Sequence, residues 1–183
     1  MVPVVIQPAV MKALIFAALG IAASAQTVVM QKTLSLGLAK TMADAALAEC
    51  KTKGFNTSVV VVDRGGQTIV ALRDENASAQ TMEMARRKAY TARMFRMATL
   101  DFQKRTEDPK YRAQRDVADI LALGGGVPIN AGNDTIGGIA SSGSTQEQDD
   151  ACAKAGIAKV VDQMRSRPAV AGRPPSGLPV ART

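Results

Sequence analysis

The sequence predicts an α+β fold in which a mainly antiparallel sheet lies between layers of helices. Along the 183 residues, the predicted elements follow in the order helix, hairpin, long helix, hairpin, helix. Hairpins imply antiparallel pairing, because a short turn can join only antiparallel strands. The first strand is uniformly apolar, which indicates that helices cover both faces of the sheet. We therefore expect a three-layer sandwich.

The first helix is predicted over residues 34–53. Leucines, alanines and Met42 recur there at helical spacing. Thr33 or Ser35 can cap its N-terminus, and Gly54 is expected to end it.

The first hairpin is predicted from two apolar runs separated by a glycine-rich turn. Residues 57–63 are rich in β-branched side chains, and residues 69–72 form a shorter apolar strand. Between them, residues 64–67 contain two glycines, which supply the positive φ that a tight turn needs.

A long second helix is predicted from residue 76 or 78 to about residue 100, since it is rich in good helix formers. One stripe of this helix carries Met84, Lys88, Thr91 and Phe95. Residues 103–116 are charged and contain Pro109, so we expect a loop or a short helical turn there.

The second half of the chain predicts another hairpin and a last helix. These elements are a strand at 124–129, a turn at Asn133-Asp134, a strand at 135–140, a polar corner at 141–144 and a helix at 145–164. Ser144 and Glu147 form a capping box at the start of that helix, although Thr145 can take the capping position instead.

Both ends of the chain are expected to lie outside the folded domain. Lys12, the apolar residues 13–23 and an A-x-A end at Ala25 are typical of a secretory signal peptide; a buried core helix is the alternative. We therefore assign residues 1–25 to an N-terminal extension and signal peptide, and residues 26–164 to the domain. Residues 165–183 are predicted to be a disordered tail containing proline and arginine. We expect export to the periplasm or the extracellular space, without stable membrane insertion after signal cleavage.

Composition excludes several classes of site. The sequence contains no histidine, which excludes a Ser-His-Asp triad, a Cys-His dyad and imidazole ligation of haem iron. The formal charge of +7 comes largely from arginines in the tail, and aromatic residues make up only 3% of the chain. We therefore expect no nucleic-acid partner. Cys50 and Cys152 can form a disulfide or remain as two buried thiols, and both alternatives stay open.

Five segments carry a resemblance to a known family. They are residues 59–66 (VVVVDRGG), 73–74 (RD), 85–92 (ARRKAYTA), 125–129 (GGVPI), and 136–143 (IGGIASSG) followed by 148–153 (QDDACA). Over about residues 34–160 the chain resembles the haem-binding and haem-degrading proteins of the HbpS and GlcG type. The resemblance implies a profilin-like fold and a homo-oligomer.

A candidate ligand site lies on the second helix. Lys88 and Thr91 are neighbours on one helix face, and Arg73 at a strand end can approach them. Together they can hold a haem propionate or a small organic acid. The alternative is an ion-paired or solvated Lys88, with Arg73 and Asp74 as a surface pair.

Two further sets of candidates concern anion and iron binding. Gly125 and Gly126, near a helix start, can hold an anion or simply allow a turn and close strand packing. For haem iron, Tyr90 and Met94 are the candidate ligands, because haem accepts Tyr or Met. The methionines at 82, 84, 94 and 97 can equally be core residues.

The function predicted from these observations is that of an exported small-ligand-binding protein whose ligand is haem or a related tetrapyrrole. The absence of the standard catalytic dyads favours binding without turnover. One alternative is an enzyme or accessory protein for a small hydroxy- or oxo-acid, in which Lys88 is a cation clamp or a Schiff-base nucleophile. A ligand-free structural oligomer is the other.

Overall fold

The computed structural model describes residues 29–165. The predicted signal peptide and residues 166–183 of the predicted tail lie outside the described residues. The chain divides into a short N-terminal unit, residues 1–31, and a folded unit that begins at Lys32. Within residues 29–165, no helix has both the length and the apolar character needed to cross a bilayer.

The folded unit contains four strands and several helices. In chain order they are α2 (Leu36–Thr52), β1 (Ser58–Val62), β2 (Thr68–Arg73), α3 (Gln80–Phe95), α4 (Thr99–Arg105), the 3-10 helix η1 (Arg112–Asp116), β3 (Gly126–Ala131), β4 (Asp134–Ser142), α5 (Gln146–Ala158) and α6 (Val161–Arg165).

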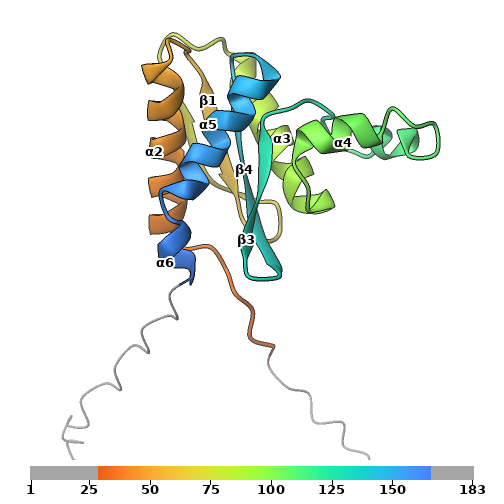
Figure 1. The fold of residues 1–183 in the computed structure, drawn as a ribbon, viewed down its shortest axis with the longest axis horizontal. Coiled ribbons are helices and arrows are strands. Elements are labelled where there is room, and N and C mark those ends of the chain that lie inside the picture. The colour runs from red at the N-terminus through yellow and green to blue at the C-terminus, as the bar shows by residue number, and fades with distance from the viewer. Residues whose placement is uncertain (1–28, 166–183) are drawn as a thin grey trace, which may run out of the picture. The chain divides into compact units, whose positions relative to one another are not determined.

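The four strands form one antiparallel sheet in the order β2-β1-β4-β3. Helices α2 and α5 cover one face of this sheet and α3 covers the other (Figure 1). The predicted three-layer α+β sandwich is therefore confirmed.

Strand β1 explains why both faces need a cover. All five of its residues are buried. Val59 and Val61 belong to the core beneath α2 and α5, whereas Val60 and Val62 belong to the core beneath α3. Alternate side chains of a strand point to opposite faces, so a continuous valine run supplies two cores at once.

Helix α2 ends as its sequence predicts. The Ser35 hydroxyl accepts a hydrogen bond from the Leu38 backbone N–H and caps the N-terminus. At the other end Gly54 has a φ of 81°, and the Gly54 and Phe55 N–H groups donate to the carbonyls of Lys51 and Cys50. These two bonds form a Schellman motif, which satisfies carbonyls that the helix leaves free.

The prediction of one long second helix is wrong. Helix α3 ends at Phe95 because Arg96 adopts a left-handed conformation, and α4 then leads away from the sheet (Figure 1). Its residues 103–105 were expected in a loop or a short helical turn, and they form the end of α4. No glycine or proline marks this break. The contact between the Phe95 and Phe102 rings, with centroids 4.3 Å apart, favours it through tertiary packing.

Three boundaries in the second half of the chain also differ from the prediction. The hairpin turn lies at Gly132-Asn133, one residue earlier than expected, since Gly132 takes a φ of 68°. Strand β4 continues through Ser142 instead of ending at residue 140. The last helix is divided into α5 and α6, and α5 is capped by Thr145, whose hydroxyl accepts from the Gln148 N–H.

Cys50 and Cys152 form a disulfide, so the alternative of two free thiols is wrong. The bond joins α2 to α5 on the same face of the sheet and closes a sequence separation of 102 residues. Loops of this length stabilise a fold by about 4.7 kcal/mol in the chain-entropy model.

Removal of this disulfide is expected to destabilise the protein. The C50A/C152A variant should lose about 3–5 kcal/mol of unfolding free energy, measured by urea denaturation of the oxidised protein. Adding a reductant should lower the stability of the wild type but leave that of the variant unchanged. Equal unfolding free energies for the variant and the oxidised wild type would contradict a stabilising disulfide.

Candidate ligand-binding pocket

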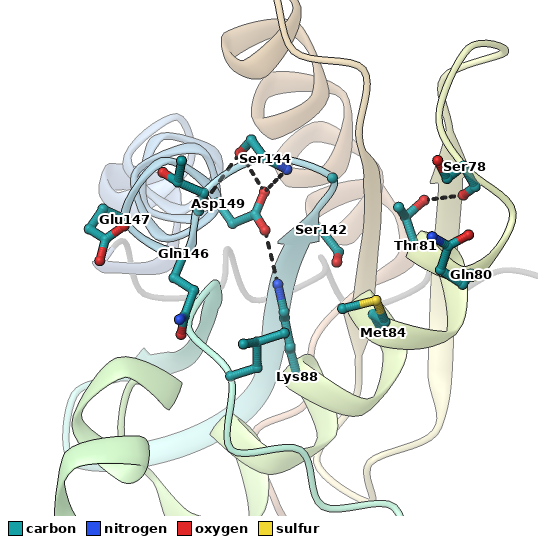
Figure 2. A pocket seen from close by; sticks show the side chains of 13 residues that line it. Ser78, Gln80, Thr81, Met84, Lys88, Ser142, Ser144, Gln146, Glu147 and Asp149 are labelled. Atoms are coloured by element: carbon teal, nitrogen blue, oxygen red, sulfur yellow. Dashed lines mark hydrogen bonds and ion pairs between the residues drawn. The ribbon is translucent and has the colours of Figure 1, made fainter.

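A pocket of about 490 Å³ opens between the first half of α3 and the start of α5 (Figure 2). This volume lies within the range of small-molecule sites. Hydroxyl and amide side chains dominate its wall. The lining residues are Ser78, Gln80, Thr81, Met84, Lys88, Leu123, Ser142, Gly143, Ser144, Thr145, Gln146, Glu147 and Asp149.

A buried ion pair lies at one side of the pocket. The Lys88 Nζ donates to Asp149 Oδ2 at 2.9 Å and to the Ser141 carbonyl at 3.2 Å. Only 1% of Lys88 is exposed. Burial lowers the pKa of the Lys88 ammonium below its ordinary value, and the charge of Asp149 opposes that shift.

Asp149 is held in place by the start of α5. Its Oδ1 accepts from the backbone N–H of Ser144 at 3.2 Å and from the Ser144 hydroxyl at 2.7 Å. Asp149 also lies in the first turn of α5, where the helix dipole favours a negative charge. The ion pair therefore connects α3 with α5, the helices on opposite faces of the sheet.

Gly125 and Gly126 allow the chain to pass close to Lys88. Gly125 has a φ of 119°, and a Cβ there would lie 2.7 Å from the Asp149 Cβ and 3.0 Å from the Lys88 Nζ. At Gly126 a Cβ would collide with the backbone oxygen of Lys88. Neither glycine lines the pocket, so the structure favours close packing over anion binding as their role.

Ser142 supplies a polar group that faces the pocket. The residue is 2% exposed and lies at the end of β4, on the pocket wall. Figure 2 shows the Ser142 hydroxyl and the Met84 thioether pointing toward the space beside Lys88 Nζ. A hydroxyl on a pocket wall can donate a hydrogen bond to a ligand or accept one from it, so Ser142 can bind a polar group there.

The expected positive charge of the site is not found in this pocket. Its charged lining residues are Lys88, Glu147 and Asp149, of which two are acids. Asp149 neutralises Lys88, so no free cation faces a ligand from the pocket wall. The N-terminus of α5 supplies the remaining positive potential, through its first backbone N–H groups.

The structure does not bring Arg73, Lys88 and Thr91 together in one ligand site. Arg73 lies outside the pocket, and its Nη1 donates to the Ala77 carbonyl at 2.6 Å, next to Ser78 at the pocket edge. Thr91 is fully buried. Its hydroxyl donates to the Arg87 carbonyl and accepts from the Leu121 N–H, so it fastens the loop before β3 to α3.

Tyr90 and Met94 also lie outside the pocket. A Cβ at Gly66 would lie 2.7 Å from a Tyr90 ring carbon and 2.6 Å from the Met94 methyl, so both side chains pack on the β1–β2 turn. Within residues 29–165, no cluster of three His, Cys, Asp or Glu residues could hold a metal ion.

Of the pocket residues, sequence reasoning made only Lys88 a site candidate; it did not assign Met84, Ser142 or Asp149 to the site. The spacing of Met84 and Lys88, four residues apart on one helix, is a signal that could have found Met84. No local signal shows that Asp149 pairs with Lys88, because the two residues meet only through the tertiary fold.

Comparisons with known proteins agree on one family. A family model described as haem degrading protein HbpS-like matches residues 34–158. A protein of Citrobacter freundii from the dhaT-dhaS intergenic region, described as uncharacterized, is 34% identical over 122 residues, which cover 64% of this chain and 84% of that protein.

Solved structures show the same similarity. A double mutant of HbpS from Streptomyces reticuli is 33% identical with a TM-score of 0.70, covering 75% of this chain and 94% of that chain. A complex of PduOC with haem is 26% identical with a TM-score of 0.64, covering 70% of this chain and 95% of that chain.

The packing role of Gly126 is tested by adding a single methyl group. We expect Gly126→Ala to lower the unfolding free energy by about 1–3 kcal/mol, because its Cβ meets the α3 backbone, which cannot rotate away. Gly37→Ala is the matched control: no atom lies within 4 Å of a Cβ there, and α2 should gain about 0.5 kcal/mol. Equal stability of both variants in urea denaturation would contradict this role.

The ion pair is tested by leaving Asp149 without a partner. We expect Lys88→Met to cost about 3–5 kcal/mol of unfolding free energy, because a buried carboxylate then lacks its counter-charge. Lys40→Met, which breaks the exposed pair with Asp44, should cost less than about 0.5 kcal/mol.

A second variant separates charge from packing. Adding Asp149→Asn to Lys88→Met removes the unpaired charge, so the double variant should recover part of the lost stability in the same denaturation experiment. A double variant less stable than Lys88→Met alone would show that the pair does not act through its charges.

Proposed function

Because the chain belongs to the haem degrading protein HbpS-like family, we propose that it binds haem or a related tetrapyrrole, and that the pocket between α3 and α5 holds this ligand. The observation that carries the proposal is a pocket of about 490 Å³ whose wall contains both Met84 and Ser142. The solved complex of the PduOC relative with haem supports the ligand class.

The pocket residues fit a tetrapyrrole in two respects. Met84 and Leu123 offer apolar contact, and the Met84 thioether is of a type that haem iron accepts. Met84 therefore replaces Tyr90 and Met94 as the proposed iron ligand, because it alone of the three lines the pocket. Bound haem would supply a redox-active iron centre.

The carboxylates of the ligand would be held without a free lysine or arginine. The first N–H groups of α5 and the hydroxyls of Ser142 and Thr145 are the donors available in the pocket. Arg73 is bonded to the Ala77 carbonyl, next to Ser78 at the pocket edge, and could approach a propionate that extends past Ser78. We keep Arg73 in the proposed site at its edge, and Lys88 as the residue that positions Asp149 and the start of α5.

Export and assembly are part of the same proposal. The signal-peptide pattern at residues 12–25 supports secretion to the periplasm or the extracellular space. The Cys50–Cys152 disulfide also supports it, since such bonds persist mainly in oxidising compartments. The homo-oligomer remains a proposal that rests on the family resemblance.

A small hydroxy- or oxo-acid is the second candidate ligand. The polar wall of the pocket and the α5 N-terminus favour it, because both suit a compact carboxylate. A Schiff-base role for Lys88 is less compatible with the geometry, since its amine is buried and bonded to Asp149 and Ser141.

Haemin titration followed at the Soret band tests the proposal. We expect saturable binding by the full chain, and Met84→Ala should weaken it by about tenfold or more and shift the band, since a ligand bond to iron is lost. Met94→Ala is the matched control and should bind haemin as the wild type does.

Three outcomes would count against this site. Absence of saturable binding at micromolar haemin would remove haem as the ligand. Loss of binding in Met94→Ala with retention in Met84→Ala would place the ligand at Tyr90 and Met94 instead. Saturable binding of glycolate, with no saturable binding of haemin, would favour the small-acid alternative.

A further inference from the structure

A group of arginines gathers at the C-terminal end of α3, about one to two helical turns beyond Lys88. Arg93 lies in the last turn of the helix, Arg96 directly follows the helix, and Arg64 lies in the β1–β2 turn that packs against it. None of the three forms a salt bridge with any of the described residues 29–165.

The charges of Arg64 and Arg96 both act on Arg93. Burial, and then the charges of Arg64 and Arg96, lower the pKa of Arg93 below its ordinary value. The charge of Asp63 has the opposite effect and raises the pKa of Arg93. Its Oδ1, however, accepts from the Gly65 and Gln67 backbone N–H groups, at 2.8 and 2.9 Å, which holds it in the turn.

Arg93 has a donor that nothing in the described chain satisfies. Its Nε is buried and has no hydrogen-bond partner there. The base of the side chain is fixed on the sheet, since a Cβ at Gly138 would lie 3.3 Å from the Arg93 Cβ. Buried donors normally have an acceptor, so the Arg93 guanidinium keeps hydrogen-bonding capacity that an anion can use.

Arg96 occupies a position where glycine would be expected. Its φ of 56° places it in the left-handed region as the residue that ends α3. Glycine adopts this conformation at lower cost, so an arginine here is unfavourable for the backbone. An added role for its charge would account for the residue type.

Half-buried Tyr90 and Met94 border the same end of the helix and pack on Gly66. They add an aromatic ring and a methyl group to a region in which the three arginines outnumber the one acid, Asp63. An acidic group on a partly apolar small molecule matches both properties, because guanidinium groups bind carboxylate and phosphate through paired hydrogen bonds.

We propose that Arg64, Arg93 and Arg96 form an oxyanion-binding site at the end of α3, which takes a phosphate or carboxylate group of a small molecule and is separate from the pocket at Ser142. Arg93 is its central donor through its guanidinium group, whose Nε has no acceptor among residues 29–165. Arg64 and Arg96 supply charge from the two segments that flank it.

Titration of the full chain with inorganic phosphate, at constant ionic strength maintained with chloride, tests this site. We expect a saturable shift of the Arg93 Nε–H signal in NMR spectra, together with a rise in Tm as phosphate saturates the folded state. A parallel titration with succinate distinguishes phosphate from carboxylate recognition; saturation by either anion supports the site.

Two substitutions test the assignment of residues. Arg93→Gln should weaken phosphate binding by about tenfold or more, because it removes the central charged donor. Arg96→Gly should also weaken binding, while its Tm in phosphate-free buffer stays equal or rises, since glycine suits the left-handed backbone. Weaker binding by a protein that is no less stable cannot be attributed to misfolding.

Arg112→Gln is the matched control, because Arg112 is an exposed arginine on η1 without a salt bridge in the described chain. It should leave phosphate binding unchanged. The proposal is overturned if phosphate produces only a linear, non-saturating response, or if Arg112→Gln weakens binding as much as Arg93→Gln. Haemin binding by Arg93→Gln should equal that of the wild type. The proposed oxyanion site and the proposed haem pocket are therefore tested separately, and a negative result for one does not count against the other.

Discussion

The buried ion pair between Lys88 and Asp149 is the interaction on which the pocket depends. It joins α3 to the first turn of α5 and so links the helix layers on opposite faces of the sheet. A buried pair is stable only when each charge keeps its partner and its hydrogen bonds. Ser144 and the Ser141 carbonyl supply those bonds, while Gly125 leaves room for the lysine head group.

The fold was largely predictable because its signals are local. The valine run of β1, the glycines of the first turn and the Ser35 and Gly54 caps each act within a few residues, and the structure follows them. The break between α3 and α4 was not predictable. Arg96 carries no signal for a left-handed conformation, and contact between the two phenylalanine rings depends on packing.

The site was less predictable, because its residues come from distant segments. Helical spacing correctly drew attention to Lys88, but it could not show that an aspartate 61 residues further along the chain neutralises it. Composition also does not show where on the fold the basic residues gather. The pocket holds more acids than bases, whereas the uncompensated arginines lie at the far end of α3, beside Tyr90 and Met94.

The most direct test of the account is to map where a tetrapyrrole contacts the protein. Gallium protoporphyrin, a diamagnetic analogue of haem, can be titrated into the isotope-labelled chain and followed by NMR. The account predicts saturable shifts at Met84, Ser142 and the N–H groups that begin α5. Shifts confined to the residues around Tyr90 and Met94, with the signals of Ser142 unchanged, would contradict it.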